Sequence, residues 1–263
     1  MKRTWIKNAR IVNEGKTFHG SIVIENDRIA EVIADGTLPL HPCDEEIDAG
    51  GCYLMPGVID DHVHFRDPGL THKADIFTES RAAAAGGVTS IMDMPNTQPL
   101  TTTLDALEQK FDLLNEKCIV NHSCYFGATN NNYTEFSKLD KHRVCGIKLF
   151  MGSSTGNMLV DKYESLVSVF KKAKELGLPV MTHCEDTDII NRNMAEAKAK
   201  YGDDPALKRS RESFAMKDNT LPDAKARDHL NHFFFCSIFL QGFFLTKFSG
   251  HRFIPFCIQP FSC

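Results

Sequence analysis

The sequence predicts an α/β protein in which a small β-module precedes about five strand–helix units of a parallel sheet. Residues 1–53 contain short apolar runs separated by turn signals, a pattern typical of β-strands joined by tight turns. From residue 54 to residue 228, an apolar run, a loop and a helical stretch follow one another repeatedly. Such a repeat forms a parallel sheet, either open and doubly wound or part of a barrel. Since a (β/α)8 barrel takes roughly 250 residues, this body is too short to close one.

The spacing of apolar residues and turn signals predicts the individual elements. Strands are expected at 4–11, 21–25, 28–33, 54–59, 88–92, 118–126, 144–150 and 178–181. Helices are expected at 75–85, 104–117, 135–141, 161–176 and 186–199. Gly86-Gly87 and Gly177 are expected to end helices in the left-handed conformation. Asp161 followed by Glu164 resembles a capping box with Asp in place of Ser or Thr.

The last segment, residues 229–263, differs from the rest in composition. It has no Asp or Glu and holds ten of the 19 Phe. Its longest apolar stretch, 233–245, is shorter than the roughly 20 residues that span a bilayer, and it follows neither helical nor strand periodicity. We therefore expect residues 229–263 to be an aberrant Phe-rich tail, the out-of-frame or misassembled end of a chain that is broken between residues 201 and 229.

Charge and cysteine usage restrict the class of protein. A formal net charge of −4 gives no basic surface of the kind that nucleic-acid-binding domains carry, so no nucleic-acid partner is expected. The start of the chain lacks the apolar core of a signal peptide, and no membrane association is expected. The cysteines of residues 1–228 lack the spacing of metal knuckles or disulfide scaffolds, so we expect reduced thiols and a cytoplasmic protein. They are Cys43, Cys52, Cys118, Cys124, Cys145 and Cys184.

Two histidines, His62 and His64, follow the first strand of the body. Strand side chains alternate between faces, so residues two apart point to the same side. The carboxyl ends of parallel strands form the catalytic edge of a barrel. Both imidazoles can therefore reach one metal ion. The alternative is a pair of surface histidines, and a lone His-x-His motif does not decide between the two.

Lys148 and His183 are two further candidates, placed at the ends of the fourth and fifth apolar runs. Burial of an unpaired lysine lowers its pKa toward that of a neutral amine. A neutral amine can react with CO₂ to give a carbamate, whose oxygens can bridge two cations. The alternative for Lys148 is a side chain that extends to solvent. Together with His62 and His64, these residues would form a metal site at one edge of the sheet.

Arg66 and Asn96 are placed to bind an anionic substrate. Arg66 follows the histidine pair by two residues, and its guanidinium suits bidentate binding of a carboxylate. Asn96 lies between Pro95 and Pro99, just after the second strand of the body, and its amide could donate to the same carboxylate. The alternative for Asn96 is an ordinary turn residue.

Four segments resemble the dihydroorotase branch of the cyclic amidohydrolase superfamily: 56–69, 82–99, 146–160 and 179–185. The most specific are Pro56-Gly57-Val58-Ile59-Asp60, continuing into His62-Val63-His64-Phe65-Arg66-Asp67-Pro68-Gly69, and Met94-Pro95-Asn96-Thr97. The similarity extends from the N-terminal β-module to about Tyr201. It implies an incomplete (β/α)8 TIM-type barrel over residues 54–228, with residues 1–53 as the β-module.

The resemblance also implies roles for the candidate residues. His62, His64 and His183 would bind Zn²⁺, two ions in a complete site, and Lys148 would be the carboxylated bridging ligand. Arg66 and Asn96 would bind the substrate's carboxylate. The family pattern further requires a zinc-binding His and a catalytic Asp in the second half of the barrel, and this sequence offers no counterpart for either. His229, His232 and His251 match no family motif. No catalytic residue is therefore assigned, and little or no activity is expected of this chain.

The activity that the resemblance implies is zinc-dependent, reversible cyclisation of N-carbamoyl-L-aspartate to dihydroorotate in pyrimidine biosynthesis. The first alternative is allantoinase or a related cyclic amidohydrolase, against which Asn96 and the carboxylate-binding character of Arg66 argue. The second is a non-catalytic assembly partner, which the missing Asp favours. Expected partners are a small-molecule carboxylate and, in the complete protein, further copies of the same chain.

Overall fold

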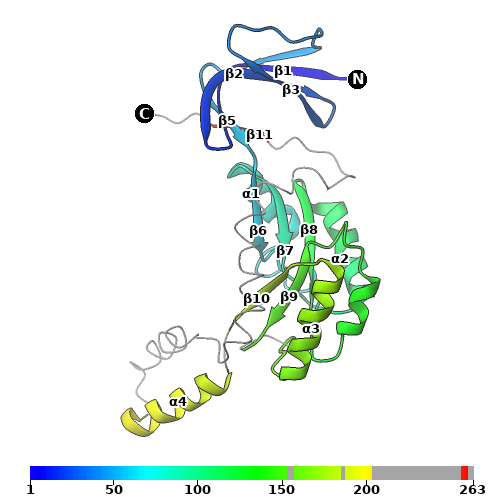
Figure 1. The fold of residues 1–263 in the computed structure, drawn as a ribbon, viewed down its shortest axis with the longest axis vertical. Coiled ribbons are helices and arrows are strands. Elements are labelled where there is room, and N and C mark those ends of the chain that lie inside the picture. Colours follow the sequence, from blue (N-terminus) through cyan, green and yellow to red (C-terminus); the bar gives the residue numbers. More distant parts are fainter. Residues whose placement is uncertain (153–156, 185–186, 203–255, 260–263) are drawn as a thin grey trace.

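Two β-sheets organise the protein in this computed structural model, which describes residues 1–152, 157–184, 187–202 and 256–259. The six-stranded N-terminal sheet has the order β11-β5-β1-β2-β3, with β4 also paired to β1. Its strands are β1 (Arg3–Asn13), β2 (Lys16–Glu25), β3 (Arg28–Ala34), β4 (Glu45–Asp48), β5 (Tyr53–Pro56) and β11 (Phe256–Gln259). This sheet lies at one end of the molecule, above the parallel sheet in Figure 1.

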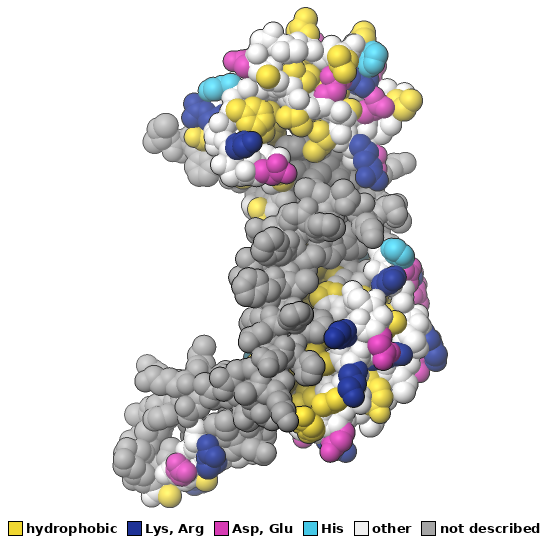
Figure 2. Space-filling model, in the orientation of Figure 1, with side chains coloured by type: hydrophobic (Ala, Val, Ile, Leu, Met, Phe, Trp, Pro, Cys, Tyr) yellow, Lys and Arg dark blue, Asp and Glu magenta, His cyan; other side chains and the backbone are white. Residues whose placement is uncertain are grey.

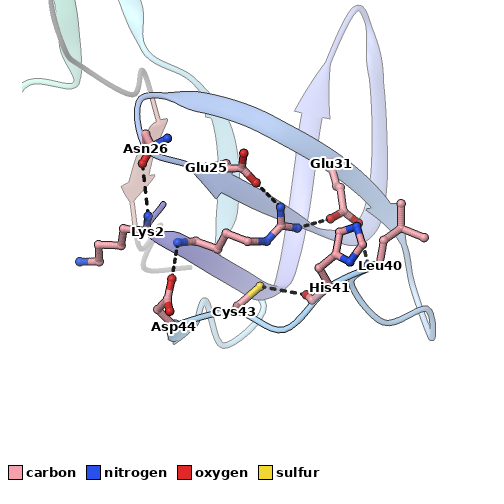
Figure 3. Close-up of polar contacts among 9 residues, drawn as sticks. Lys2, Glu25, Asn26, Glu31, Leu40, His41, Cys43 and Asp44 are labelled. Atoms are coloured by element: carbon pink, nitrogen blue, oxygen red, sulfur yellow. Dashed lines mark hydrogen bonds and ion pairs between the residues drawn. The ribbon is translucent and has the colours of Figure 1, made fainter.

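An arginine at the start of β1 fixes the loop that follows β3. Arg3 forms ion pairs with Glu25 and Glu31, on the two strands next along the sheet. Its backbone N–H donates to Asp44 Oδ2 at 2.7 Å, and Glu31 also accepts from the backbone N–H of Leu40 at 3.0 Å. Figure 3 shows Glu25 and Glu31 meeting at one guanidinium, with Asp44 at the backbone end of the same residue. The loop is therefore bound to the sheet by charge-assisted hydrogen bonds, with little apolar burial of its own.

The second sheet has five strands, all parallel, in the order β10-β9-β8-β7-β6. They are β6 (Val58–Val63), β7 (Val88–Asp93), β8 (Asn121–Gly127), β9 (Gly146–Phe150) and β10 (Val180–His183). The connecting helices are α1 (Ile76–Ala85), α2 (Leu104–Lys117), the 3₁₀ helix η1 (Tyr133–Lys138) and α3 (Tyr163–Leu176), and α4 (Thr187–Tyr201) follows β10. The sheet is a curled half-barrel, which confirms the predicted incomplete barrel of about five βα units behind a β-module.

The main hydrophobic core lies between the half-barrel and its helices. Alternate residues of the strands, such as Ile91, Phe126 and Ile147, pack against fully buried residues of the helices, such as Leu114 and Val169. On the outer surface over α2 and α3, charged side chains of both signs lie interspersed (Figure 2). The apolar face of each helix therefore meets one face of the sheet, and the other face of the sheet is left to line the interior of the barrel.

The expected run 54–59 proves to be two strands that belong to different sheets. β5 ends at Pro56 and pairs with β1 in the N-terminal sheet, whereas β6 begins at Val58 and pairs with β7. Gly57 alone separates them. A Cβ on this residue would lie 2.1 Å from Thr89 Oγ1, so only glycine allows the chain to pass so close to β7. An apolar run has no internal signal for such a change of sheet, which is why the sequence predicted one strand.

Two other expectations of local structure are wrong. The helix expected at 135–141 is a short 3₁₀ helix, in keeping with its weak apolar periodicity. The capping box at Asp161 does not form: α3 is capped by Lys162 without a side-chain hydrogen bond, and Asp161 Oδ1 instead accepts from Asn130 Nδ2 at 3.1 Å. The expectation for Gly177 is confirmed, since it ends α3 at φ 69°. At the end of α1 the left-handed residue is Gly87, not the cap Gly86.

Most of the Phe-rich tail lies outside the described residues. Of residues 229–263, the structure describes 256–259, which form β11 and pair antiparallel with β5. The six cysteines at positions 1–228 are free thiols. In the described part of the chain, no helix combines the length and the apolar character that crossing a membrane requires.

Truncation of the core residue Leu114 to alanine should destabilise the protein strongly. Its side chain is fully buried in α2, so Leu114→Ala removes apolar contacts and leaves a cavity, at a cost of about 2–5 kcal/mol. Chemical denaturation followed by circular dichroism measures the loss. Tyr163→Ala on α3, where the side chain is 68% exposed, is the control and should change the free energy of unfolding by less than about 0.5 kcal/mol. Equal effects of the two variants would contradict the assigned core.

Candidate functional site

The interior face of the half-barrel carries the candidate site. Side chains of one strand alternate between the helix layer and the interior. Ile147 and Leu149 of β9 and Phe126 of β8 belong to the helix-side core. Their neighbours Lys148 and Tyr125 therefore face the interior. Tyr125 there packs in a small cluster with Met92 of the neighbouring strand β7 and with Met181 of β10, two strands away on the other side. The sheet thus directs Lys148 away from the helices and into the barrel.

Lys148 is an isolated cation in this interior. Its side chain is only 2% exposed, and its Nζ lies 4.7 Å from the centroid of the Phe150 ring. None of the ion pairs among the described residues includes it. Burial lowers the pKa of this amine from its ordinary value. The alternative of a Lys148 side chain that extends to solvent is thus not what the structure has, and the neutral amine that carbamate formation needs is favoured.

His62 and His64 lie side by side at the carboxyl end of β6. Their ring centroids are 5.4 Å apart and the rings are inclined at 52°. Partial burial lowers the pKa of His62, and the charges of Lys148 and His183 act in the same direction. Burial also lowers the pKa of His64, with the charge of Arg66 next in importance. Both imidazoles are therefore biased toward the neutral form that binds a metal ion.

The backbone that carries His62 is held by a side chain as well as by the sheet. The pairing of β6 with β7 is irregular between Asp60 and Val63, so the ordinary ladder of hydrogen bonds is interrupted at Asp61 and His62. Tyr125 Oη donates to the backbone carbonyl oxygen of Asp61 at 3.1 Å. A buried tyrosine from β8 thus replaces part of the missing ladder, one residue before the first histidine.

His183 ends β10 on the interior side of the sheet. It pairs in register with Phe150 of β9, and the centroids of their rings are 5.8 Å apart. Beside it, Cys184 Sγ donates to Thr182 Oγ1 at 3.0 Å. The charges of His183 and Lys148 both act on His62. The candidate residues of β6, β9 and β10 thus lie at the same end of the half-barrel, and their convergence on one metal ion stays a prediction.

Arg66 and Asn96 gather around His64. Arg66 has a backbone φ of 65°, a left-handed conformation that is uncommon for an arginine. Its charge lowers the pKa of His64, while the Asn96 side chain raises it, so both groups lie near the imidazole. An arginine, an amide and a histidine on one loop cluster suit an anionic group beside a metal ion.

The chemistry of this donor set fits a divalent metal. Imidazole nitrogens suit Zn²⁺ and related ions, and a carboxylated lysine would add oxygen ligands. A cluster of at least three His, Cys, Asp or Glu side chains close enough to hold a metal ion does not occur within the described ranges. His62, His64 and His183 all belong to the described residues, so these three histidines do not by themselves converge into such a cluster. The ligand roles of His62, His64, Lys148 and His183 stay a prediction, as do the substrate contacts of Arg66 and Asn96.

Sequence reasoning missed the residues that support this site. Tyr125, Asp93 and Lys110 contact the histidine segment or the residues next to it. A signal was available for Asp93, since an acidic residue at the end of an apolar strand needs a buried partner. Lys110 lies on the apolar side of an amphipathic helix, where its charge breaks the expected pattern. No such signal marks Tyr125.

The sequence comparisons with known proteins all point to one family. A sequence profile described as the amidohydrolase family matches residues 53–232. An L-hydantoinase of Paenarthrobacter aurescens is 32% identical over 203 residues, which are 76% of this chain and 44% of that protein. A dihydroorotase of Methanosarcina acetivorans is 37% identical over 185 residues, which are 69% of this chain and 38% of that protein.

Solved structures agree. The L-hydantoinase (dihydropyrimidinase) of Arthrobacter aurescens superimposes with a TM-score of 0.71 at 31% identity, covering 78% of this chain and 46% of that one. A D-hydantoinase gives a TM-score of 0.62 at 29% identity, with 77% and 44% covered. The chain thus spans less than half the length of the relatives it matches.

Removal of the Tyr125 hydroxyl should loosen the segment that carries His62. Tyr125→Phe leaves the carbonyl of Asp61 without this donor, and loss of such a part-buried hydrogen bond costs about 0.5–1.5 kcal/mol. Thermal and chemical denaturation measure the change. Tyr163→Phe, on the exposed side of α3, is the matched control and should have almost no effect. A Tyr125→Phe protein as stable as the parent would show that the hydroxyl does not support the segment.

Proposed function

The chain belongs to the amidohydrolase family, and on that premise we propose that it carries the metal-binding part of a cyclic amidohydrolase of the dihydroorotase type. The reaction proposed for the whole protein is reversible cyclisation of N-carbamoyl-L-aspartate to dihydroorotate. One observation supports the proposal most directly: His62, His64, Lys148 and His183 lie at or next to the carboxyl ends of parallel strands of one half-barrel, and Lys148 is buried there. The catalytic groups of barrel enzymes lie at this end of the strands.

The proposed ligands of the metal are the three histidines and a carboxylated Lys148. In the carbamate, the neutral amine of Lys148 forms a bond to the carbon of CO₂ and releases one proton. Burial without a carboxylate partner supports this modification because it favours the neutral amine. A divalent ion such as Zn²⁺, bound in this setting, supplies a water of lowered pKa and polarises the carbonyl that is attacked.

The remaining residues of the proposed site bind and orient the substrate. Arg66 and Asn96 hold its carboxylate beside His64, which fixes the ring relative to the metal ligands. Arginine suits this role because its planar fork of donors matches a carboxylate. The apolar residues of the interior, Met92 and Met181 among them, limit the access of bulk water to the site.

A hydantoinase-type activity is the second candidate. It is favoured by the L-hydantoinases among both the related sequences and the related structures. The two candidates differ in the group that Arg66 and Asn96 would meet, because dihydroorotate carries a carboxylate on its ring and hydantoin does not. The preference for dihydroorotate over hydantoin as the substrate rests on Arg66 and Asn96 beside His64.

Arg66→Met should separate the two candidates. Loss of a charge-assisted contact worth about 1.5–3 kcal/mol should weaken binding of dihydroorotate to the metal-loaded chain by about ten- to a hundredfold and leave hydantoin binding nearly unchanged. Calorimetric titration measures both affinities. Arg143→Met, which removes an ion pair with Glu108 and a cation–π contact with the Phe111 ring, both outside the candidate site, is the control. Tighter binding of hydantoin than of dihydroorotate by the parent would reverse the assignment.

His183→Ala should reduce bound metal to background. With one of the few ligands gone, the remaining side chains do not complete the coordination that Zn²⁺ requires. The metal-to-protein ratio after dialysis against Zn²⁺ and gel filtration is the measurement. His142→Ala serves as control, because His142 lies exposed in the loop before β9. An unchanged ratio in His183→Ala would exclude this residue as a ligand.

A further inference from the structure

A buried ion pair lies directly behind the histidine segment. Asp93, the last residue of β7, pairs with Lys110 of α2, and the two side chains are 0% and 1% exposed. Removing two charges from water costs several kcal/mol, which their attraction offsets only where further hydrogen bonds satisfy both groups. The further hydrogen bonds of Asp93 and Lys110 are therefore needed to stabilise the pair, and they identify the backbone segments that the pair fixes in place.

The Asp93 carboxylate binds the two loops that carry the proposed substrate contacts. Its Oδ1 accepts from the backbone N–H of Phe65 at 3.0 Å and from that of Met94 at 2.9 Å. Phe65 stands between His64 and Arg66, and Met94 precedes Asn96 by two residues. One carboxylate thus joins the two segments from which His64, Arg66 and Asn96 project.

Lys110 extends the same network to the next part of the loop. Its Nζ contacts Asp93 and also donates to the backbone carbonyl oxygen of Asp67, the residue after Arg66. Lys117, about two helical turns further along the same face of α2, pairs with the Asp67 carboxylate at 2.8 Å. Helix α2 therefore holds the loop after β6 through two lysines, one buried and one partly exposed.

The pairing of the strands explains why a side chain is needed here. Regular contacts between β6 and β7 end with Val63 opposite Asp93, where the Met94 N–H donates to the Val63 carbonyl oxygen at 2.9 Å. Phe65 lies beyond that point, and its N–H has no main-chain acceptor across the sheet. The Asp93 carboxylate accepts from this N–H in place of the main-chain carbonyl that a further pair of strand residues would have supplied.

We propose that Asp93, neutralised by Lys110, is a positioning residue that sets the loop after β6 against the loop after β7 so that His64, Arg66 and Asn96 meet the same ligand. The inference rests on the proposed function for the roles of those three residues. Asp93 itself contacts neither metal nor substrate in this arrangement and acts through the backbone of Phe65 and Met94.

Two double variants of equal charge test the role of the acceptor. Asp93→Asn with Lys110→Met keeps an oxygen for the two N–H groups, whereas Asp93→Leu with Lys110→Met replaces it by an apolar side chain of similar shape. Replacement of a buried ion pair by apolar residues of similar volume is often neutral or stabilising, so both proteins are expected to fold. Co²⁺ is the probe, because its visible absorption reports ligand geometry, and exchange of the Phe65 amide proton with solvent is followed by NMR.

The Leu variant should bind Co²⁺ at least tenfold more weakly than the Asn variant, the usual loss when a group that orients metal ligands is removed. Its Phe65 amide should exchange at least tenfold faster. The Asn variant should stay within about threefold of the parent in both measurements. Equal Co²⁺ affinity and spectrum in the two variants, with a faster Phe65 amide only in the Leu variant, would overturn the proposal.

Exchange of the Phe65 amide proton decides the proposal in two further cases. If the Leu variant does not fold, slow exchange of Phe65 in the parent and in the Asn variant supports the proposal, and exchange as fast as that of an exposed amide overturns it. If the parent binds no Co²⁺, the proposed metal site fails. The positioning role is then judged from Phe65 exchange and from the shift of the Asn96 side-chain amide between the two variants.

Discussion

A residue on a parallel strand of this half-barrel can face only the helices or the interior, because the pleat of the strand allows no third direction. Helix-side positions are taken by residues such as Ile91, Phe126, Ile147 and Leu149, which hold α1, α2 and α3 to the sheet. Because side chains alternate along each strand, these helix-side residues also determine which residues face the interior. The packing that stabilises the domain thus also determines which side chains are available for chemistry.

This constraint explains how much of the fold could be predicted from the sequence. The five parallel strands of the half-barrel follow from apolar runs, and the shared direction of His62 and His64 follows from a period of two. The division of 54–59 between two sheets could not be predicted, because it depends on how close Gly57 passes to Thr89. The failed capping box has a similar cause: Asp161 was within reach of Asn130, a residue distant in sequence.

The residues of the candidate site likewise fall into those that the sequence predicted and those that only the structure revealed. Types and spacings of residues pointed to His62, His64, Lys148 and His183, since each type has a chemistry of its own. Tyr125 could not be found by that reasoning, because its importance comes from the backbone group that it meets. A tyrosine is as common in a core as in a site, and its hydroxyl gains meaning only when the irregular pairing of β6 leaves the Asp61 carbonyl to be satisfied.

The junction at Gly57 has a consequence for how such a chain can change over time. Since β5 and β6 are separated by this single residue, the N-terminal sheet and the half-barrel share almost continuous backbone, with no linker to absorb a change in length. One residue inserted into β6 between Val58 and Asp61 would either bulge or shift the strand by one position. A shift of one reverses every side chain and would turn His62 toward the helices. Insertions and deletions are therefore expected to accumulate in other connections, while this one keeps its length.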